Sequence, residues 1–170
     1  MKESPNVLAS NVTALKCELA REVLRSSGVL RLQVTGWSML PTVWPGDDLV
    51  IERVDSNRIS TGDIVLFGRD TRLFVHRVIS KVDNLDGGLG VITRGDGMSI
   101  PDGPVASSEV LGRVSLIRRS GKYVTPATSM GLFKSALAAI VQRSVLASRI
   151  LVRLHSFCEP PQEQVVPCQN

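Results

Sequence analysis

Residues 34–50 read VTGWSMLPTVWPGDDLV and surround one small hydroxyl group, that of Ser38, with bulky and turn-forming neighbours. The stretch holds two tryptophans, two prolines and two glycines and ends in adjacent aspartates, although aromatic residues make up only 4% of the chain. Glycine and proline at this density predict a tight turn after the strand-like segment VLRLQVT, residues 29–35. A serine in such a turn is a candidate nucleophile, which needs a neighbouring base to take its proton.

The composition is that of a globular protein of ordinary size. Of the 170 residues, 43% are hydrophobic and 21% are charged, so the chain can bury a core without disulfide or metal support. The formal net charge of +4 is compatible with an anionic partner or with solubility alone, and we expect no nucleic-acid partner. The cysteines, Cys17, Cys158 and Cys168, are odd in number and form no C-x-x-C motif. We therefore expect no disulfide framework, no metal and no cofactor.

The first 120 residues divide into a helical and a strand-rich part. In residues 1–28, apolar side chains recur at helical spacing at Leu8, Val12, Leu15, Leu19 and Val23. This pattern predicts an N-terminal amphipathic helix that packs on the domain through that stripe. Residues 29–120 hold short β-branched segments separated by Gly, Pro, Asp and Asn, which predict a mainly antiparallel β domain. No apolar run has secretory or spanning length, so we expect no cleaved signal and no N-terminal anchor.

The C-terminal part is predicted to be a linker, a helix and a tail. Residues 121–155 begin with the linker GKYVTPATSM and continue into a basic amphipathic helix with four cationic side chains. Such a helix, over residues 130–155, can dock on a membrane surface, on a partner protein or on its own domain. Residues 156–170 are rich in Pro and Gln and are predicted to be disordered. We expect a protein that is cytoplasmic or peripheral to the cytoplasmic membrane.

The chain offers few bases and carboxylates that can serve Ser38. Its two histidines are His76, in the strand-like segment LFVHRVI, and His155. His76 alternates with Phe74 and Val78, a setting that on its own is typical of a packed structural histidine. The segment TRGDGMSIPDGPV adds two aspartates, Asp96 and Asp102. Each of them, considered alone, is typical of a turn. A carboxylate beside an imidazole fixes its tautomer, so serine, histidine and aspartate have complementary roles.

The order of these segments resembles a known superfamily. GWSMLPT with PGDDLV, then TGDIVLF, FVHRVI and TRGD followed by VLGRV, resemble the signal peptidase I superfamily over about residues 33–115. That superfamily also contains the self-cleaving LexA and UmuD-type proteases. The resemblance implies a signal-peptidase/LexA-like antiparallel β domain, here with flanking N-terminal and C-terminal α-helices. Bacterial members use a lysine base where this chain has His76, so the chain is most similar to the endoplasmic-reticulum and archaeal signal peptidases, which use Ser, His and Asp.

The resemblance assigns roles to individual residues. Ser38 is expected to be the nucleophile, His76 the general base and then the general acid, and Asp102 the carboxylate that orients His76. In that subgroup the acting aspartate follows the Gly-Asp pair by six residues, which selects Asp102 and leaves Asp96 as a secondary candidate. The backbone N–H of Ser38 is expected to stabilise the oxyanion.

The same resemblance places four substrate-binding residues around the nucleophile: Gly36, Trp37, Met39 and Pro41. Many signal peptidases have a serine at the position of Gly36, and glycine there lets a substrate backbone approach closely. Members of the family bind an extended peptide beside a strand edge. For Trp37 and Trp44 two interpretations stay open, packing around the turn or an apolar rim for peptide or lipid.

These observations predict a serine endopeptidase that cleaves a leader, signal or propeptide, with a peptide or preprotein as its partner. Two alternatives are a LexA/UmuD-like regulatory module that cleaves itself or dimerises, and a non-catalytic peptide-binding domain. The regulatory alternative would be favoured by an upstream DNA-binding domain and an Ala-Gly or Cys-Gly cleavage site. The first 30 residues contain neither.

Overall fold

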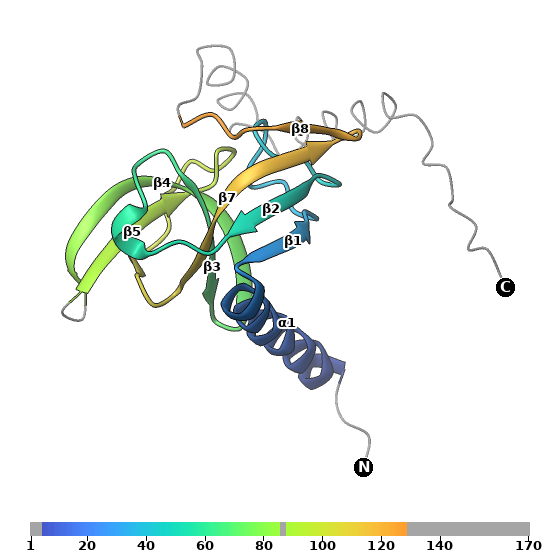
Figure 1. Cartoon of the computed structure of the whole chain (residues 1–170). Helices are drawn as coiled ribbons and strands as arrows, with labels where there is room; N and C mark the ends of the chain where they lie inside the picture. Colours follow the sequence, from blue (N-terminus) through green and yellow to red (C-terminus); the bar gives the residue numbers. More distant parts are fainter. Residues whose placement is uncertain (1–4, 86–87, 129–170) are drawn as a thin grey trace, which may run out of the picture.

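The computed structural model describes residues 5–85 and 88–128, and in these residues one long helix lies beneath a strongly curved sheet (Figure 1). The predicted C-terminal helix and tail lie outside the described residues. The elements follow one another as α1 (Pro5–Ser27), β1 (Val29–Gln33), β2 (Asp48–Glu52), the short 3-10 helix η1 (Ser56–Arg58), β3 (Ile64–Arg69), β4 (Arg72–Leu85), β5 (Gly88–Arg94), β6 (Val105–Ala106), β7 (Val110–Arg119) and β8 (Lys122–Val124).

The strands form one antiparallel sheet in the order β1-β2-β7-β3-β4-β5-β6, and β8 pairs with β7. The strand β7 joins the two halves of the sheet because it pairs with both β2 and β3. Antiparallel neighbours, β-branched side chains and Gly-containing connections are what the sequence predicts for residues 29–120. The predicted mainly antiparallel β domain with an N-terminal helix is therefore confirmed.

In the described part of the chain, β1 and the first half of β4 each have one edge without a strand partner. β1 stands at one end of the strand order and pairs only with β2. β4 pairs with β3 through residues 72–77, but its pairing with β5 begins only at Arg77. The other edge of residues 72–76 is therefore open. Open edges expose backbone N–H and C=O groups that can bind a further extended chain.

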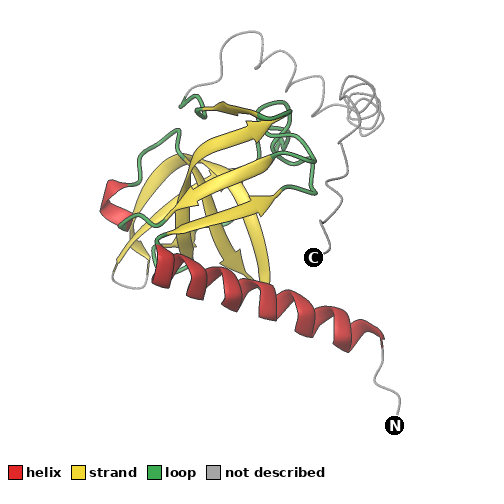
Figure 2. Cartoon of the chain, turned by 45° about the vertical axis from the view of Figure 1, so that its right-hand side comes forward, coloured by secondary structure: helices red, strands yellow, loops and turns green. Residues whose placement is uncertain are grey.

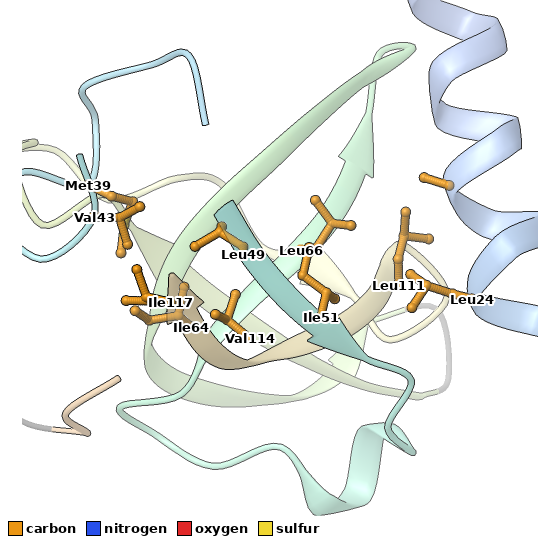
Figure 3. Packing of buried hydrophobic residues seen from close by; sticks show 11 residues of the cluster. Leu24, Met39, Val43, Leu49, Ile51, Ile64, Leu66, Leu111, Val114 and Ile117 are labelled. Carbon is orange, nitrogen blue, oxygen red and sulfur yellow. The ribbon is translucent and has the colours of Figure 1, made fainter. Parts of the chain in front are cut away.

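The core consists of two clusters on opposite sides of β4. Leu73 and Val75 pack against one cluster, which holds Leu24, Met39 and Ile51, whereas Phe74 and Val78 belong to the other. Side chains alternate between the two faces of a strand, so His76 lies on the face of Phe74 and Val78, as the sequence predicts. In Figure 3, Met39 and Val43 lie at one end of the first cluster and Leu24 of α1 at the other.

The helix α1 packs through a different face from the one that the sequence predicts. Its buried side chains are Cys17, Ala20 and Leu24, which follow one another at spacings of three and four residues. The predicted stripe is instead exposed, at Val12 (51%), Leu15 (68%) and Leu19 (60%). The small side chains of Cys17 and Ala20 allow α1 to approach β1 and β4 closely, which larger side chains would prevent. No helix in residues 5–85 and 88–128 has both the length and the hydrophobicity of a membrane span.

Residues 122–128, which the sequence assigns to a linker, run along the domain. Residues 122–124 form β8, and the carbonyl oxygen of Ala127 accepts a hydrogen bond from Arg77 Nη1 at 2.7 Å. Gly62 has a φ of +97°, and a Cβ there would collide with the carbonyl oxygen of Thr128. Glycine at position 62 is thus required both by its backbone conformation and by the chain that crosses it.

Candidate active site

Ser38 lies in a loop that follows β1 and is closed at its base by backbone hydrogen bonds. The N–H of Val34 donates to the carbonyl oxygen of Asp47, and the N–H of Gly46 donates to that of Val34, each at 2.8 Å. The Asp47 carboxylate accepts from the N–H of Trp44 at 2.8 Å and from Arg119 Nε at 2.8 Å. These bonds explain why the sequence between β1 and β2 needs glycine and aspartate at its end, because they fix the loop that carries the serine.

The side chains that follow Ser38 fill the interior of the loop. Met39 is 2% exposed, and Pro41 is buried and joined to Leu40 by a cis peptide bond. The indole N–H of Trp44 donates to the carbonyl oxygen of Pro41 at 2.9 Å, and its ring faces the Arg119 guanidinium. Trp44 therefore has a packing role in the turn.

The structure brings Ser38, His76 and Asp102 together from three separate segments. Ser38 Oγ lies 3.0 Å from His76 Nε2, and His76 Nδ1 lies 2.6 Å from Asp102 Oδ2. An ionised carboxylate only accepts hydrogen bonds, so Nδ1 carries the proton and donates it to Asp102. Nε2 is then free to accept the hydroxyl proton of Ser38. This is the relation of nucleophile, base and orienting carboxylate that acyl transfer at serine requires.

Thr93 holds the carboxylate of this trio in place. Its hydroxyl donates to Asp102 Oδ2 at 2.6 Å, and its carbonyl oxygen accepts from the N–H of Asp102 at 2.8 Å. Thr93 is fully buried on β5, whereas Asp102 follows in the loop between β5 and β6. Sequence reasoning assigned Thr93 no role. The available signal was a threonine near the end of a strand, two residues before the Gly-Asp pair.

The imidazole of His76 is enclosed by two aromatic rings. The ring centroids of Phe67 and Phe74 each lie 6.0 Å from that of His76. Only 6% of His76 is exposed. These neighbours restrict the imidazole ring to one orientation and keep water from most of its surface.

Asp96, the secondary candidate, lies against Arg77 in the structure. Arg77 Nε and Nη2 donate to the two carboxylate oxygens of Asp96, both at 2.8 Å, and both side chains are buried. Arg77 Nη1 also donates to the carbonyl oxygen of Gly62 at 2.8 Å. A bidentate pair of this kind fixes both partners in position and satisfies their charges. Asp96 therefore pairs with Arg77, and Asp102 is the aspartate that contacts the imidazole of His76.

The loop that contains Asp96 also contacts the nucleophile. The N–H of Gly97 donates to the carbonyl oxygen of Ser38 at 2.8 Å, and a Cβ on Gly95 would lie 2.5 Å from the same oxygen. Real Cβ atoms do not approach an oxygen so closely, so only glycine at position 95 allows this contact. The ion pair between Arg77 and Asp96 fixes this loop, and the loop in turn contacts the backbone of Ser38 through Gly95 and Gly97.

The backbone N–H of Ser38 donates no hydrogen bond to any residue within the described ranges. It therefore remains available to a developing oxyanion. Gly36, two residues earlier, is exposed, and a Cβ built on it meets no atom within 4 Å. The space in front of Gly36 is open for a substrate backbone.

A groove of about 510 Å³ runs from this site along the open edges of β1 and β4. Residues 32–36 of the β1 side and residues 72–76 of β4 line the groove, together with Ser38 and His76. Gly36 and Met39 are among the lining residues, whereas Pro41 is buried beside them and Trp37, 49% exposed, stands outside the lining. Within the described residues, no group of three or more His, Cys, Asp or Glu side chains is placed to hold a metal ion.

The N-terminal part of this chain matches the model of a known protein family. The model of the Peptidase S24-like family matches residues 5–86, from α1 through the end of β4, and so includes Ser38 and His76 but not Asp102. No curated protein matches this chain significantly. The match supports similarity to the LexA/signal peptidase I superfamily at the level of a serine protease or a LexA/UmuD-like module.

Proposed function

We propose that this chain is a serine endopeptidase that cleaves a leader, signal or propeptide. The observation that carries the proposal is the continuous hydrogen-bonded line from Ser38 Oγ to His76 Nε2 (3.0 Å) and from His76 Nδ1 to Asp102 (2.6 Å). The Peptidase S24-like match supports serine protease chemistry independently, because it covers the segments that carry Ser38 and His76. The finer similarity to the Ser-His-Asp signal peptidases supports the choice of substrate.

Each step of acyl transfer has a residue in position for it. His76 takes the hydroxyl proton as Ser38 Oγ attacks the scissile carbonyl carbon, and Asp102 stabilises the resulting imidazolium. The oxyanion accepts a hydrogen bond from the N–H of Ser38. His76 then gives its proton to the leaving amine, and a water molecule, deprotonated by His76 in turn, hydrolyses the acyl-enzyme ester. No step needs a metal or a cofactor.

The groove suits a peptide in extended conformation. Backbone groups on the open edges of β1 and β4 can pair with a substrate strand laid between them. Met39 and Val43 line the groove near Ser38, so an apolar side chain next to the cut fits this part of the groove. The exposed indole of Trp37 stands beside the catalytic end, where it can contact peptide that extends beyond the groove.

The peptidase proposal is tested by identifying the bonds that the protein cuts. A mixed peptide library is incubated with the wild-type protein, with Ser38→Ala and with the matched control Ser60→Ala, whose exposed side chain lies outside the groove. Mass spectrometry is expected to find new termini with the wild type and the control and none with Ser38→Ala. Circular dichroism establishes that all three proteins are folded. Cleavage that persists in Ser38→Ala overturns the proposal.

A LexA/UmuD-like regulatory module is the second candidate, and the Peptidase S24-like match favours it to the same degree. Such a module cleaves its own chain, and intramolecular cleavage has a rate that does not depend on protein concentration. Incubation of the purified protein over a hundredfold range of concentration therefore separates the two candidates. Concentration-independent self-cleavage that requires Ser38 supports the regulatory module, and cleavage confined to added peptides supports the processing protease.

The location of the protease is a further part of the proposal: cytoplasmic, or peripheral to the cytoplasmic membrane through residues 130–155. The support is the pattern of apolar and cationic residues in that sequence. Sedimentation with anionic vesicles, with and without residues 130–155, tests membrane docking. Docking is contradicted when the truncation leaves the sedimented fraction unchanged.

A further inference from the structure

The groove has a second end, remote from Ser38, where α1 lies across it. Thr13 and Lys16 of α1 line the groove together with the beginning of β4. α1 contacts both β1 and β4, and Figure 2 shows it running across the bottom of the sheet. Figure 3 places α1 at the opposite end of the core from Met39, the neighbour of Ser38. The helix therefore borders the part of the groove that a substrate occupies away from the scissile bond.

This second end of the groove is cationic. Lys16 and Arg72 line it, and no Asp or Glu is among the lining residues that the structure describes. Neither cation has an ion pair with any residue in 5–85 or 88–128. Arg72 is the first residue of β4. It lies on the same strand face as His76, because side chains alternate between the two faces and these residues are four positions apart. Two unpaired cations in one groove favour an anionic group on the peptide.

We infer that the groove selects peptides with an acidic side chain three to five residues from the scissile bond, which Lys16 and Arg72 bind. The inference rests on the proposed peptidase function and names the substrate class for that site. The spacing follows from the strand. Arg72 and His76 are four residues apart on β4, roughly 13 Å at about 3.3 Å per residue, and an extended peptide beside β4 advances by the same rise.

The solvent exposure of Lys16 and Arg72 limits how strongly the groove can prefer an acidic substrate residue. Lys16 and Arg72 are both exposed to solvent, so each contact with a substrate carboxylate is partly screened. Replacing the acidic residue by its neutral isostere is therefore expected to lower kcat/KM roughly 3- to 10-fold at low ionic strength. The preference is expected to weaken as salt is added, since the Debye length falls to about 8 Å at 0.15 M.

The inference is tested by comparing cut sites among charge variants of equal net charge. The double variant Lys16→Glu/Arg72→Glu reverses the cationic end of the groove. The matched control Arg58→Glu/Lys122→Glu makes the same change at two exposed residues that do not line the groove. Each protein is incubated with the mixed peptide library, and the residues around every Ser38-dependent cut are aligned. Synthetic peptides with Glu, Gln or Lys at the enriched position then give kcat/KM.

The wild type and the control are expected to cut sites enriched in Asp or Glu three to five residues from the scissile bond. Lys16→Glu/Arg72→Glu is expected to lose that enrichment and to prefer Lys or Arg there. Ser38-dependent cuts without acidic enrichment, or enrichment retained in the charge reversal, overturn the inference and leave the peptidase proposal standing. The absence of any Ser38-dependent cut overturns the proposed function and the inference together.

Discussion

Thr93 holds Asp102 at two points, because its hydroxyl donates to Asp102 Oδ2 at 2.6 Å and its carbonyl oxygen accepts from the Asp102 N–H at 2.8 Å. The same carboxylate oxygen accepts from His76 Nδ1. A loop residue is thus attached to the end of β5, and the position of the imidazole depends on that attachment. In the proposed mechanism, Thr93 is a positioning residue for His76 as the general base.

Removal of the Thr93 hydroxyl is expected to lower turnover. In Thr93→Val the side-chain shape is nearly kept, but Asp102 loses one hydrogen bond, which is worth about 1 kcal/mol or more when one partner is charged. We expect kcat to fall roughly 5- to 30-fold with KM little changed, and Thr93→Ser to restore most of the turnover. Unchanged kcat in Thr93→Val together with a loss in Thr93→Ser would contradict this role and would show that the methyl group, and hence packing, is what matters.

Gly36→Ala is expected to weaken substrate binding without changing stability. A Cβ at this position meets no atom within 4 Å, and Gly36 has no left-handed backbone conformation that alanine would resist. The added methyl group projects into space that a substrate backbone would occupy. Steady-state kinetics should show a raised KM, while denaturant unfolding should show an unchanged midpoint. An unchanged KM would mean that the substrate does not approach Gly36.

Breaking the buried pair of Arg77 and Asp96 is expected to destabilise the fold strongly. Asp96→Asn leaves the Arg77 guanidinium buried without a compensating charge, which typically costs about 3–5 kcal/mol. Urea unfolding measures the change in the free energy of unfolding. Glu22→Gln, which removes an exposed ion pair with Arg25 on α1, is the control and should leave the unfolding midpoint in place. A change for Asp96→Asn as small as that of the control would contradict the structural role of the pair.

Glu109 is expected to make stability depend on pH. Its partial burial raises the pKa of the carboxyl, but hydrogen bonds from Arg69 and from the Ala106 N–H, with the charges of Arg69 and Arg21, outweigh burial and hold the pKa below its ordinary value of 4.5. Because the folded-state pKa is depressed, Glu109 contributes stability above the unfolded-state pKa, and this contribution is lost as pH falls below about 4.5.

The measurement is the free energy of unfolding of wild type and Glu109→Gln between neutral pH and pH 3. The difference between the two proteins should be constant near neutrality and should shrink as the pH falls through the acidic range. A difference that stays the same at every pH would show that the Arg69 contact contributes nothing through the charge of Glu109.

The antiparallel domain was predictable from the sequence, because turn residues and alternating strands are local signals. Ser38, His76 and Asp102 were selected through the resemblance to the signal peptidase I superfamily, since by local pattern alone His76 is typical of a packed residue and Asp102 of a turn. The face of α1 that packs on the sheet was not predictable from the sequence. The strongest apolar stripe, with Leu15 and Leu19, points to solvent, and the small residues that permit close packing give a weak periodic signal. The contact of Thr93 with Asp102 and the presence of Lys16 and Arg72 in one groove could not be foreseen either. They depend on how the loop after β5 folds back and on where α1 crosses the sheet.

In the proposed mechanism Ser38 and His76 act as one catalytic unit, and a double-mutant cycle on kcat/KM measures whether they do. Wild type, Ser38→Ala, His76→Ala and the double variant are assayed with one peptide that the wild type cleaves. Members of one unit are strongly non-additive, so the double variant should be scarcely slower than either single variant. Additive losses, or cleavage retained by Ser38→Ala, would show that Ser38 and His76 do not form one catalytic unit.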